Sequence, residues 1–90
     1  MFNLQNNGQE LACNFDARQS FYGKAIVRLE DGKLILTSYV TDVAYIEKEK
    51  AFVNGRYSQT TTRHIKEFLK QNGFKADTMK QVLNDYGVSE

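Results

Sequence analysis

Apolar and polar side chains alternate along residues 24–39 with the period of two that is typical of a β-strand. The alternation is divided by Asp31-Gly32, a dipeptide that tolerates the positive φ angles of a type I′ turn. In the returning half, Leu34 and Leu36 would pair with the apolar face of the first half. The pattern therefore predicts a tight antiparallel hairpin over residues 24–39.

Two further strands are expected after this hairpin, at residues 43–47 and 51–53, with a charged turn between them. The last strand runs into Asn54-Gly55, which leaves two alternatives open. This dipeptide could turn a second hairpin onto the next two residues, or Gly55 could form a bulge that lets the strand continue to Tyr57. The bulge is slightly favoured, because the strand is otherwise very short.

The first part of the chain, residues 1–20, carries the weakest pattern. Several asparagines favour turns, while Leu11, Cys13 and Phe15 alternate with polar residues as a short strand would. We expect an irregular arm or a short strand there.

The period changes after Ser58, a residue type that favours the N-cap position of a helix. One stripe with helical spacing contains Thr61, Ile65, Phe68, Leu69 and Asn72. The residues expected largely on the outside are Arg63, Lys66, Glu67 and Lys70. Gly73 would end the helix, with Phe74 folding back onto the last turn. The pattern predicts a helix over residues 58–73.

A second helix is predicted over residues 77–86, beginning at Asp77 as its N-cap and stopped by Gly87. The order of elements indicates an α+β fold: an antiparallel meander of about four strands in residues 21–57, followed by two C-terminal helices. Packing the first helix on one sheet face would bury both apolar surfaces. Residues 1–90 are expected to form a single domain.

The composition fits one small folded domain and excludes several larger classes of protein. The 90 residues are 41% hydrophobic, 12% aromatic and 26% charged, which is not a disordered composition. The chain is too short for a complete dinucleotide-binding domain or a TIM barrel. The single cysteine, Cys13, excludes an intramolecular disulfide and is expected to be a buried, small apolar residue in a reducing compartment.

Sequence signals for membranes and for catalysis are missing. No apolar run approaches the roughly eighteen residues of a membrane span, and no secretory signal is visible, so we expect a cytoplasmic protein. Catalytic motifs such as GxSxG, a Walker loop and HExxH are absent. The single histidine, His64, has no second histidine at metal-ligand spacing. We therefore expect no enzymatic activity, no cofactor and no metal site.

Three segments form a recognisable series: residues 20–25, residues 38–46 with the sequence SYVTDVAYI, and residues 57–69 with the sequence YSQTTTRHIKEFL. Their order and spacing resemble a family of small uncharacterised proteins encoded by bacteriophages, plasmids and integrative elements. The resemblance covers about residues 18–74. It implies a mobile-element accessory protein without an assigned activity, and it brings no catalytic residue.

The formal net charge of +1 conceals an uneven distribution along the chain. Residues 50–75 hold six basic residues and one acidic residue, whereas residues 1–49 and 76–90 each carry a net charge of −2. The basic segment would suit phosphates or an acidic protein surface, and the alternative is a solvated helix face. The candidate partner- or phosphate-binding residues are Arg56, Tyr57, Thr60, Arg63, Lys66 and Lys70.

Each of these candidates also has a structural interpretation. Thr60 lies in the first helical turn, where free N–H groups bind anions, but the segment could simply cap the helix while Arg63 pairs with an acidic residue of the sheet. Tyrosines that could stack bases, or pack in the sheet, are Tyr22, Tyr39, Tyr45 and Tyr57. His64 is expected to be a packed residue with one hydrogen bond.

The leading hypothesis is a non-enzymatic mobile-element protein that binds a host or element-encoded protein, for example as an anti-CRISPR-like inhibitor of a bacterial defence nuclease. The alternative is a weak nucleic-acid-binding accessory factor that uses residues 50–75. Self-association is compatible with either, because an open sheet has two edges. A hydrolase is third, because it would need His64 beside a carboxylate in a cleft.

Overall fold

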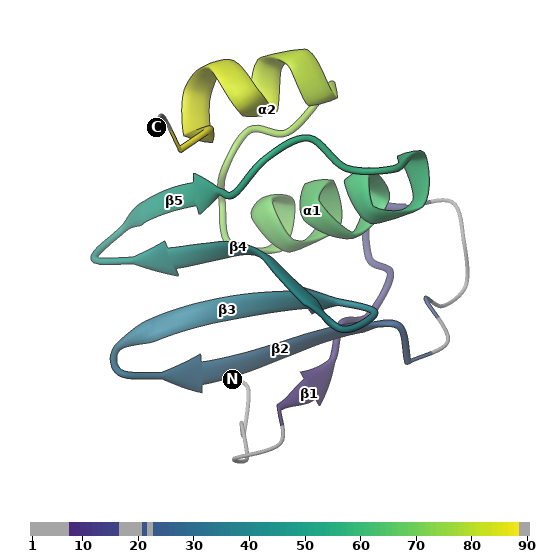
Figure 1. The fold of residues 1–90 in the computed structure, drawn as a ribbon, viewed down its shortest axis with the longest axis vertical. Coiled ribbons are helices and arrows are strands. Elements are labelled where there is room, and N and C mark those ends of the chain that lie inside the picture. Colours follow the sequence, from purple (N-terminus) through teal and green to yellow (C-terminus); the bar gives the residue numbers. More distant parts are fainter. Residues whose placement is uncertain (1–7, 17–20, 22, 89–90) are drawn as a thin grey trace.

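Strands that follow one another in the chain lie side by side in the sheet (Figure 1). The computed structural model describes residues 8–16, 21 and 23–88. Within them the elements are β1 (Gln9–Glu10), β2 (Ala25–Glu30), β3 (Lys33–Ser38), β4 (Thr41–Glu47), β5 (Lys50–Val53), α1 (Gln59–Gln71) and α2 (Met79–Tyr86). In this described part all neighbouring strands pair antiparallel, in the order β1-β2-β3-β4-β5. The predicted α+β meander with two C-terminal helices is confirmed.

The predicted hairpin is present as β2 and β3. Asp31 and Gly32 have φ angles of 52° and 79°, as a type I′ turn requires. Leu34 pairs with Leu29 and Leu36 pairs with Val27, so the apolar face forms as the alternation predicted.

The four strands predicted in residues 21–57 are present as β2 to β5, and a fifth strand, β1, consists of only Gln9 and Glu10, in the segment for which an irregular arm or a short strand was predicted. These residues pair with Val27 and Ile26 of β2, and the N–H of Leu11 continues the ladder to the carbonyl of Ala25 at 2.8 Å. A strand of two residues leaves too little alternation to be visible in the sequence.

Both alternatives for Asn54-Gly55 were wrong, because β5 ends at Val53 without a bulge or a second hairpin. The C-terminal segment takes the neighbouring position instead. Val53 pairs in parallel with Gly87, and its carbonyl accepts a hydrogen bond from the N–H of Val88 at 3.0 Å. The chain leaves the sheet after Val53 and connects to α1.

Both predicted caps of α1 are confirmed. The hydroxyl of Ser58 accepts from the N–H of Thr61 at 3.3 Å. At the other end Gly73 has a φ angle of 85°, and the N–H of Phe74 donates to the carbonyl of Leu69 at 2.9 Å. This is the Schellman arrangement that an αL glycine followed by an apolar residue favours.

The predicted N-cap of α2 was wrong by one residue, because Thr78 and not Asp77 has this position. The hydroxyl of Thr78 accepts from the N–H of Gln81 at 3.1 Å, while the amide oxygen of Gln81 accepts from the N–H of Asp77 at 2.8 Å. Both residue types are good caps, so their order in the sequence did not distinguish them. The predicted end at Gly87 is confirmed.

The core lies between one sheet face and the helices, with α1 against the sheet and α2 beyond β5 (Figure 1). Its largest fully buried apolar side chains are Leu36, Val43, Val53, Ile65, Phe68, Leu69 and Val82. Half-buried side chains on the opposite sheet face include Ile26, Arg28, Ile35, Tyr45 and Phe52. Only one face of the sheet is therefore covered by the helices.

Candidate functional site

An open cleft of about 200 Å³ lies beside α1. Among the described residues its lining consists of Phe15, Asp16, Arg63, Lys66, Glu67 and Lys70. Arg63, Lys66 and Lys70 are spaced by three and four positions along α1, which places them on one side of the helix. The structure thus brings together half of the six residues that the sequence nominated for a partner or a phosphate.

Glu67 lines this cleft and binds the segment at Phe15 and Asp16 that forms its opposite wall. Its Oε1 accepts hydrogen bonds from the backbone N–H groups of Phe15 and Asp16, both at 2.8 Å. Its Oε2 accepts from Nε2 of Gln71 at 2.6 Å, and the same Nε2 also donates to the carbonyl of Ala12 at 2.6 Å. Glu67 thereby fastens the N-terminal arm to α1.

The expectation that Glu67 lies on the outside of the helix was wrong, since this residue is only 2% exposed. A carboxylate can be buried when hydrogen-bond donors replace its water, and the arm supplies such donors from its own backbone. Because the donors are backbone groups some fifty residues away, no side-chain pattern in the sequence could show them.

The arm runs along α1 in the direction opposite to the helix. Ala12 is bonded to Gln71, Asp16 lies at Glu67, and Phe21 packs edge-on against His64 with ring centroids 4.5 Å apart. Asp16 also pairs with Arg63, with Oδ1 and Nη1 separated by 3.5 Å. The acidic partner expected for Arg63 is therefore on the arm and not in the sheet.

The cleft carries charges of both signs. Asp16 offsets part of the positive charge of Arg63, whereas Lys66 makes only a long hydrogen bond of 3.5 Å from Nζ to the carbonyl of Asp77. Lys70 is half-buried at the rim. The cleft therefore offers the cationic side chains of Lys66 and Lys70 to a carboxylate or phosphate of a ligand. The carboxylate of Asp16 beside them would repel a further negative group.

The remaining nominated residues do not line the cleft. Arg56 is exposed on the connection between β5 and α1, and Tyr57 packs against the core from the same connection. Thr60 is half-buried in the first turn of α1. The six residues predicted as one site are therefore divided between a cleft on α1 and the connection that leads into it.

His64 is packed in the core, as expected, and is 1% exposed. Its Nδ1 lies 2.8 Å from the hydroxyl of Ser38, which in turn lies 3.0 Å from the hydroxyl of Thr61. Ser38 is also buried, at 2% exposed. Because both residues are buried, a substrate cannot reach this serine–histidine pair in the folded state. The contact instead holds α1 against β3.

The tyrosines lie in three different environments. Tyr45, on the sheet face away from the helices, stacks on Phe52 with ring centroids 4.8 Å apart, and Nζ of Lys33 lies 5.1 Å from the Tyr45 ring centroid. Tyr39 is exposed in the turn between β3 and β4, and Tyr57 is partly buried. Tyr22 lies outside the described residues.

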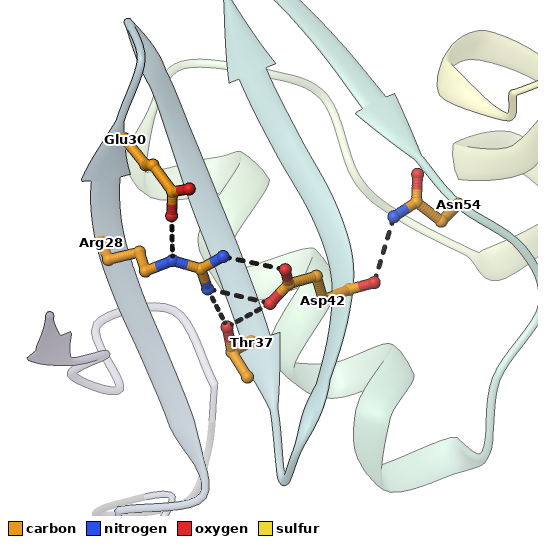
Figure 2. Close-up of polar contacts among 5 residues, drawn as sticks. All are labelled: Arg28, Glu30, Thr37, Asp42 and Asn54. Carbon is orange, nitrogen blue, oxygen red and sulfur yellow. Dashed lines mark hydrogen bonds and ion pairs between the residues drawn. The ribbon is translucent and has the colours of Figure 1, made fainter. Parts of the chain in front are cut away.

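A polar network that no sequence pattern had indicated lies on the outer sheet face (Figure 2). The guanidinium of Arg28 binds both carboxylate oxygens of Asp42, each at 2.9 Å, and donates to Oε2 of Glu30 at 3.0 Å. The hydroxyl of Thr37 accepts from Arg28 and donates to Asp42, and the Nδ2 of Asn54 donates to the Asp42 carbonyl. The network joins side chains of β2, β3 and β4.

Hydrogen bonds within this network shift the pKa values of its members. Those from Arg28 and Thr37 lower the pKa of Asp42 to about 2, and the bonds to Asp42 and Glu30 raise the pKa of Arg28. Both groups stay charged at neutral pH and neutralise one another. The ion pair of Arg28 and Asp42 therefore offers little net charge to a ligand.

The described residues contain no helix that is long and apolar enough to cross a membrane. Within the same part of the chain, no three His, Cys, Asp or Glu side chains gather in a way that could hold a metal ion.

Comparison with known proteins identifies the family of this chain. The model of a family of unknown function, DUF8033, matches residues 9–85, from β1 almost to the end of α2. The chain belongs to this family. No curated protein and no solved structure matches the chain. The DUF8033 description names neither an activity nor mobile elements, so the function has to be argued from the geometry.

Proposed function

We propose that this DUF8033 protein is a non-enzymatic binding module that docks on an acidic surface of another protein through the cleft beside α1. One observation carries the proposal: Arg63, Lys66 and Lys70 line an open cleft whose opposite wall, at Phe15 and Asp16, is fixed by hydrogen bonds. A preorganised cleft loses little conformational freedom when a partner binds. Lysines at its rim attract carboxylates over several ångströms.

The mixed charge of the cleft favours a protein partner over a nucleic acid. A phosphate backbone is uniformly negative, and one that followed the cleft along α1 would pass the carboxylate of Asp16, which lines it. A protein surface can place a carboxylate against Lys66 or Lys70 and a neutral group against Asp16. Complementarity of this kind provides specificity between proteins.

A finer role rests on the sequence resemblance alone. If the protein is a mobile-element accessory protein, its partner is a host or element-encoded protein, and an anti-CRISPR-like inhibitor of a defence nuclease is one form of this role. The genes beside the coding sequence test it. Neighbours that encode phage or conjugation functions would support this role, whereas a housekeeping operon would contradict it.

A second candidate function follows from the outer sheet face. The stacked rings of Tyr45 and Phe52, with Lys33 beside them, are chemically suited to stack an unpaired base and contact its phosphate. Fluorescence anisotropy with single-stranded DNA and RNA over a salt series tests this function. Absence of binding at low salt, or affinity that is insensitive to salt, would eliminate it.

The leading proposal is tested by capture of proteins from a bacterial lysate on the immobilised wild type and two charge variants. Lys66→Glu/Lys70→Glu reverses the rim of the cleft, and Lys48→Glu/Lys80→Glu makes the same change in net charge at exposed lysines elsewhere. We expect a saturable partner that is lost by the first variant, retained by the second and weakened by salt. Equal capture by both variants would refute docking through the cleft.

A further inference from the structure

The turn between β3 and β4 presents two apolar side chains to solvent. Tyr39 and Val40 are the two residues between the paired positions Ser38 and Thr41, so the connection is as short as a hairpin allows. Val40 is 94% exposed and Tyr39 is 50% exposed. Both are large for a surface turn, where small and polar residues prevail.

The backbone of this turn is also unfavourable for its residues. Tyr39 has a φ angle of 58°, in the left-handed region that glycine and asparagine adopt readily and tyrosine does not. The same sheet contains a well-matched turn at Asp31-Gly32. Strain of this kind is commonly retained at functional sites.

The turn lies beside α1, near the stretch of the helix that holds the arm. The Tyr39 ring centroid is 5.9 Å from that of His64, and His64 is three residues before Glu67, which holds Phe15. Residues three apart share a helix face and are separated by about 4.5 Å along the axis. Phe15 is itself 59% exposed. Exposed apolar groups of the turn and the arm therefore flank one stretch of α1.

Positive charges border these apolar groups. Nζ of Lys24 lies 5.5 Å from the ring centroid of Tyr39, while Lys66 and Lys70 line the cleft beside Phe15. Apolar anchors bordered by charged side chains are the usual anatomy of a protein–protein interface, in which a few buried anchors carry most of the binding energy. Val40 has no ring with which to stack a base, which argues against a nucleic acid at this point.

We infer that Tyr39 and Val40 are the apolar anchor of the interface, and that its occupant is a protein segment with apolar residues flanked by carboxylates. This inference rests on the proposed function, because the same partner would place its carboxylates on Lys66 and Lys70. The further claim is that Tyr39 and Val40 enter an apolar pocket of the partner. Docking through the cleft alone would not require such a pocket.

The test uses random peptides displayed on phage and selected on the full-length wild-type protein. We expect selected peptides in which apolar residues stand between Asp or Glu. Val40→Asn should weaken their binding roughly tenfold or more, because an anchor is lost. Its melting temperature should stay within about 3 °C of the wild type, since Val40 is almost fully exposed. Leu29→Asn is the matched control: Leu29 is 61% exposed beside the Asp31-Gly32 turn, at the opposite end of the sheet.

The outcomes separate this inference from the proposed function. If Lys66→Glu/Lys70→Glu weakens binding and Val40→Asn does not, the inference is overturned and docking through the cleft stands. If only Val40→Asn weakens binding, the anchor is supported and the acidic contact to the cleft fails. A selection without binders overturns the inference, and so does wild-type self-association that Val40→Asn abolishes, because the occupant would then be a second copy.

Discussion

Glu67 and Phe15 are joined by a hydrogen bond of 2.8 Å from the Phe15 N–H to a carboxylate oxygen that is buried in the folded chain. This bond and its counterpart from Asp16 connect α1 to an arm that precedes it by about fifty residues. The cleft exists because these bonds hold the arm beside the cationic side of α1.

Glu67→Gln should destabilise the fold and release the arm. The amide keeps one acceptor oxygen but places its N–H₂ group against either the backbone donors or the Nε2 of Gln71, so at least one buried group loses its partner at a cost of about 1–3 kcal/mol. Urea denaturation measures the loss, and hydrogen exchange of the Phe15 and Asp16 amides reports the arm. The control Glu49→Gln, in an exposed turn, should change neither. Unchanged protection of the Phe15 and Asp16 amides in Glu67→Gln would contradict the role of Glu67 in holding the arm.

Asp42→Asn should remove a stabilisation that depends on pH. The pKa of Asp42 is lowered to about 2 in the folded state from 3.8, mainly by its hydrogen bond with Arg28. The contribution is therefore complete above pH 4 and is lost as the pH falls towards 2. Because Asp42 is half exposed, we expect a loss of only about 1 kcal/mol at pH 7. Urea denaturation at several pH values should show a difference from wild type that shrinks below pH 4; a constant difference would contradict the ion pair.

Lys48→Asn/Glu49→Gly should stabilise the protein. Lys48 and Glu49 form the two-residue turn between β4 and β5 with φ angles of 51° and 66°, which Asn-Gly adopts more readily. Relief of this strain should raise the free energy of unfolding by about 1 kcal/mol, or the melting temperature by roughly 5 °C. Differential scanning calorimetry measures the change. A lower melting temperature would mean that these side chains stabilise the turn in another way.

Ser38→Ala should weaken the attachment of α1 to β3. The buried hydroxyl is within hydrogen-bond distance of both His64 and Thr61, so its removal leaves buried polar atoms with one partner fewer, at about 1–3 kcal/mol. Thr41→Ala, at the exposed start of the next strand, is the control. Equal stability of the two variants in urea would show that the buried contact contributes nothing.

The local elements were predictable because their signals lie within a few residues. Asp31-Gly32 alone selects the hairpin turn, and Ser58 and Gly73 limit α1 through bonds to residues three to five positions away. The N-cap of α2 was wrong by one residue because two good capping residues are adjacent, whereas the two larger errors occurred where a distant segment decides. The strand expected to continue past Val53 ends there, next to Gly87, and Glu67 is buried by backbone groups of the arm.

The candidate site was predictable in part. The charge of residues 50–75 directed attention to Arg63, Lys66 and Lys70, which the cleft brings together. The same charge included Arg56, which lies elsewhere, because net charge along a segment does not say on which side each residue projects. The anchor proposed at Val40 carries no charge, and the resemblance of residues 38–46 assigned it no role. Its exposure and the φ angle of its neighbour are properties of the folded chain.

By itself, the sequence determined the class of fold, the hairpin, the ends of the first helix and the location of excess positive charge. These features depend on side-chain periodicity and on turn chemistry over short separations. The tertiary structure decided that the arm lies along α1, that Glu67 fastens it, that a cleft opens beside the cationic side of the helix, and that Tyr39 and Val40 are exposed in a turn. Such relations depend on backbone donors and packing between distant segments, which the order of residue types does not encode in any local pattern.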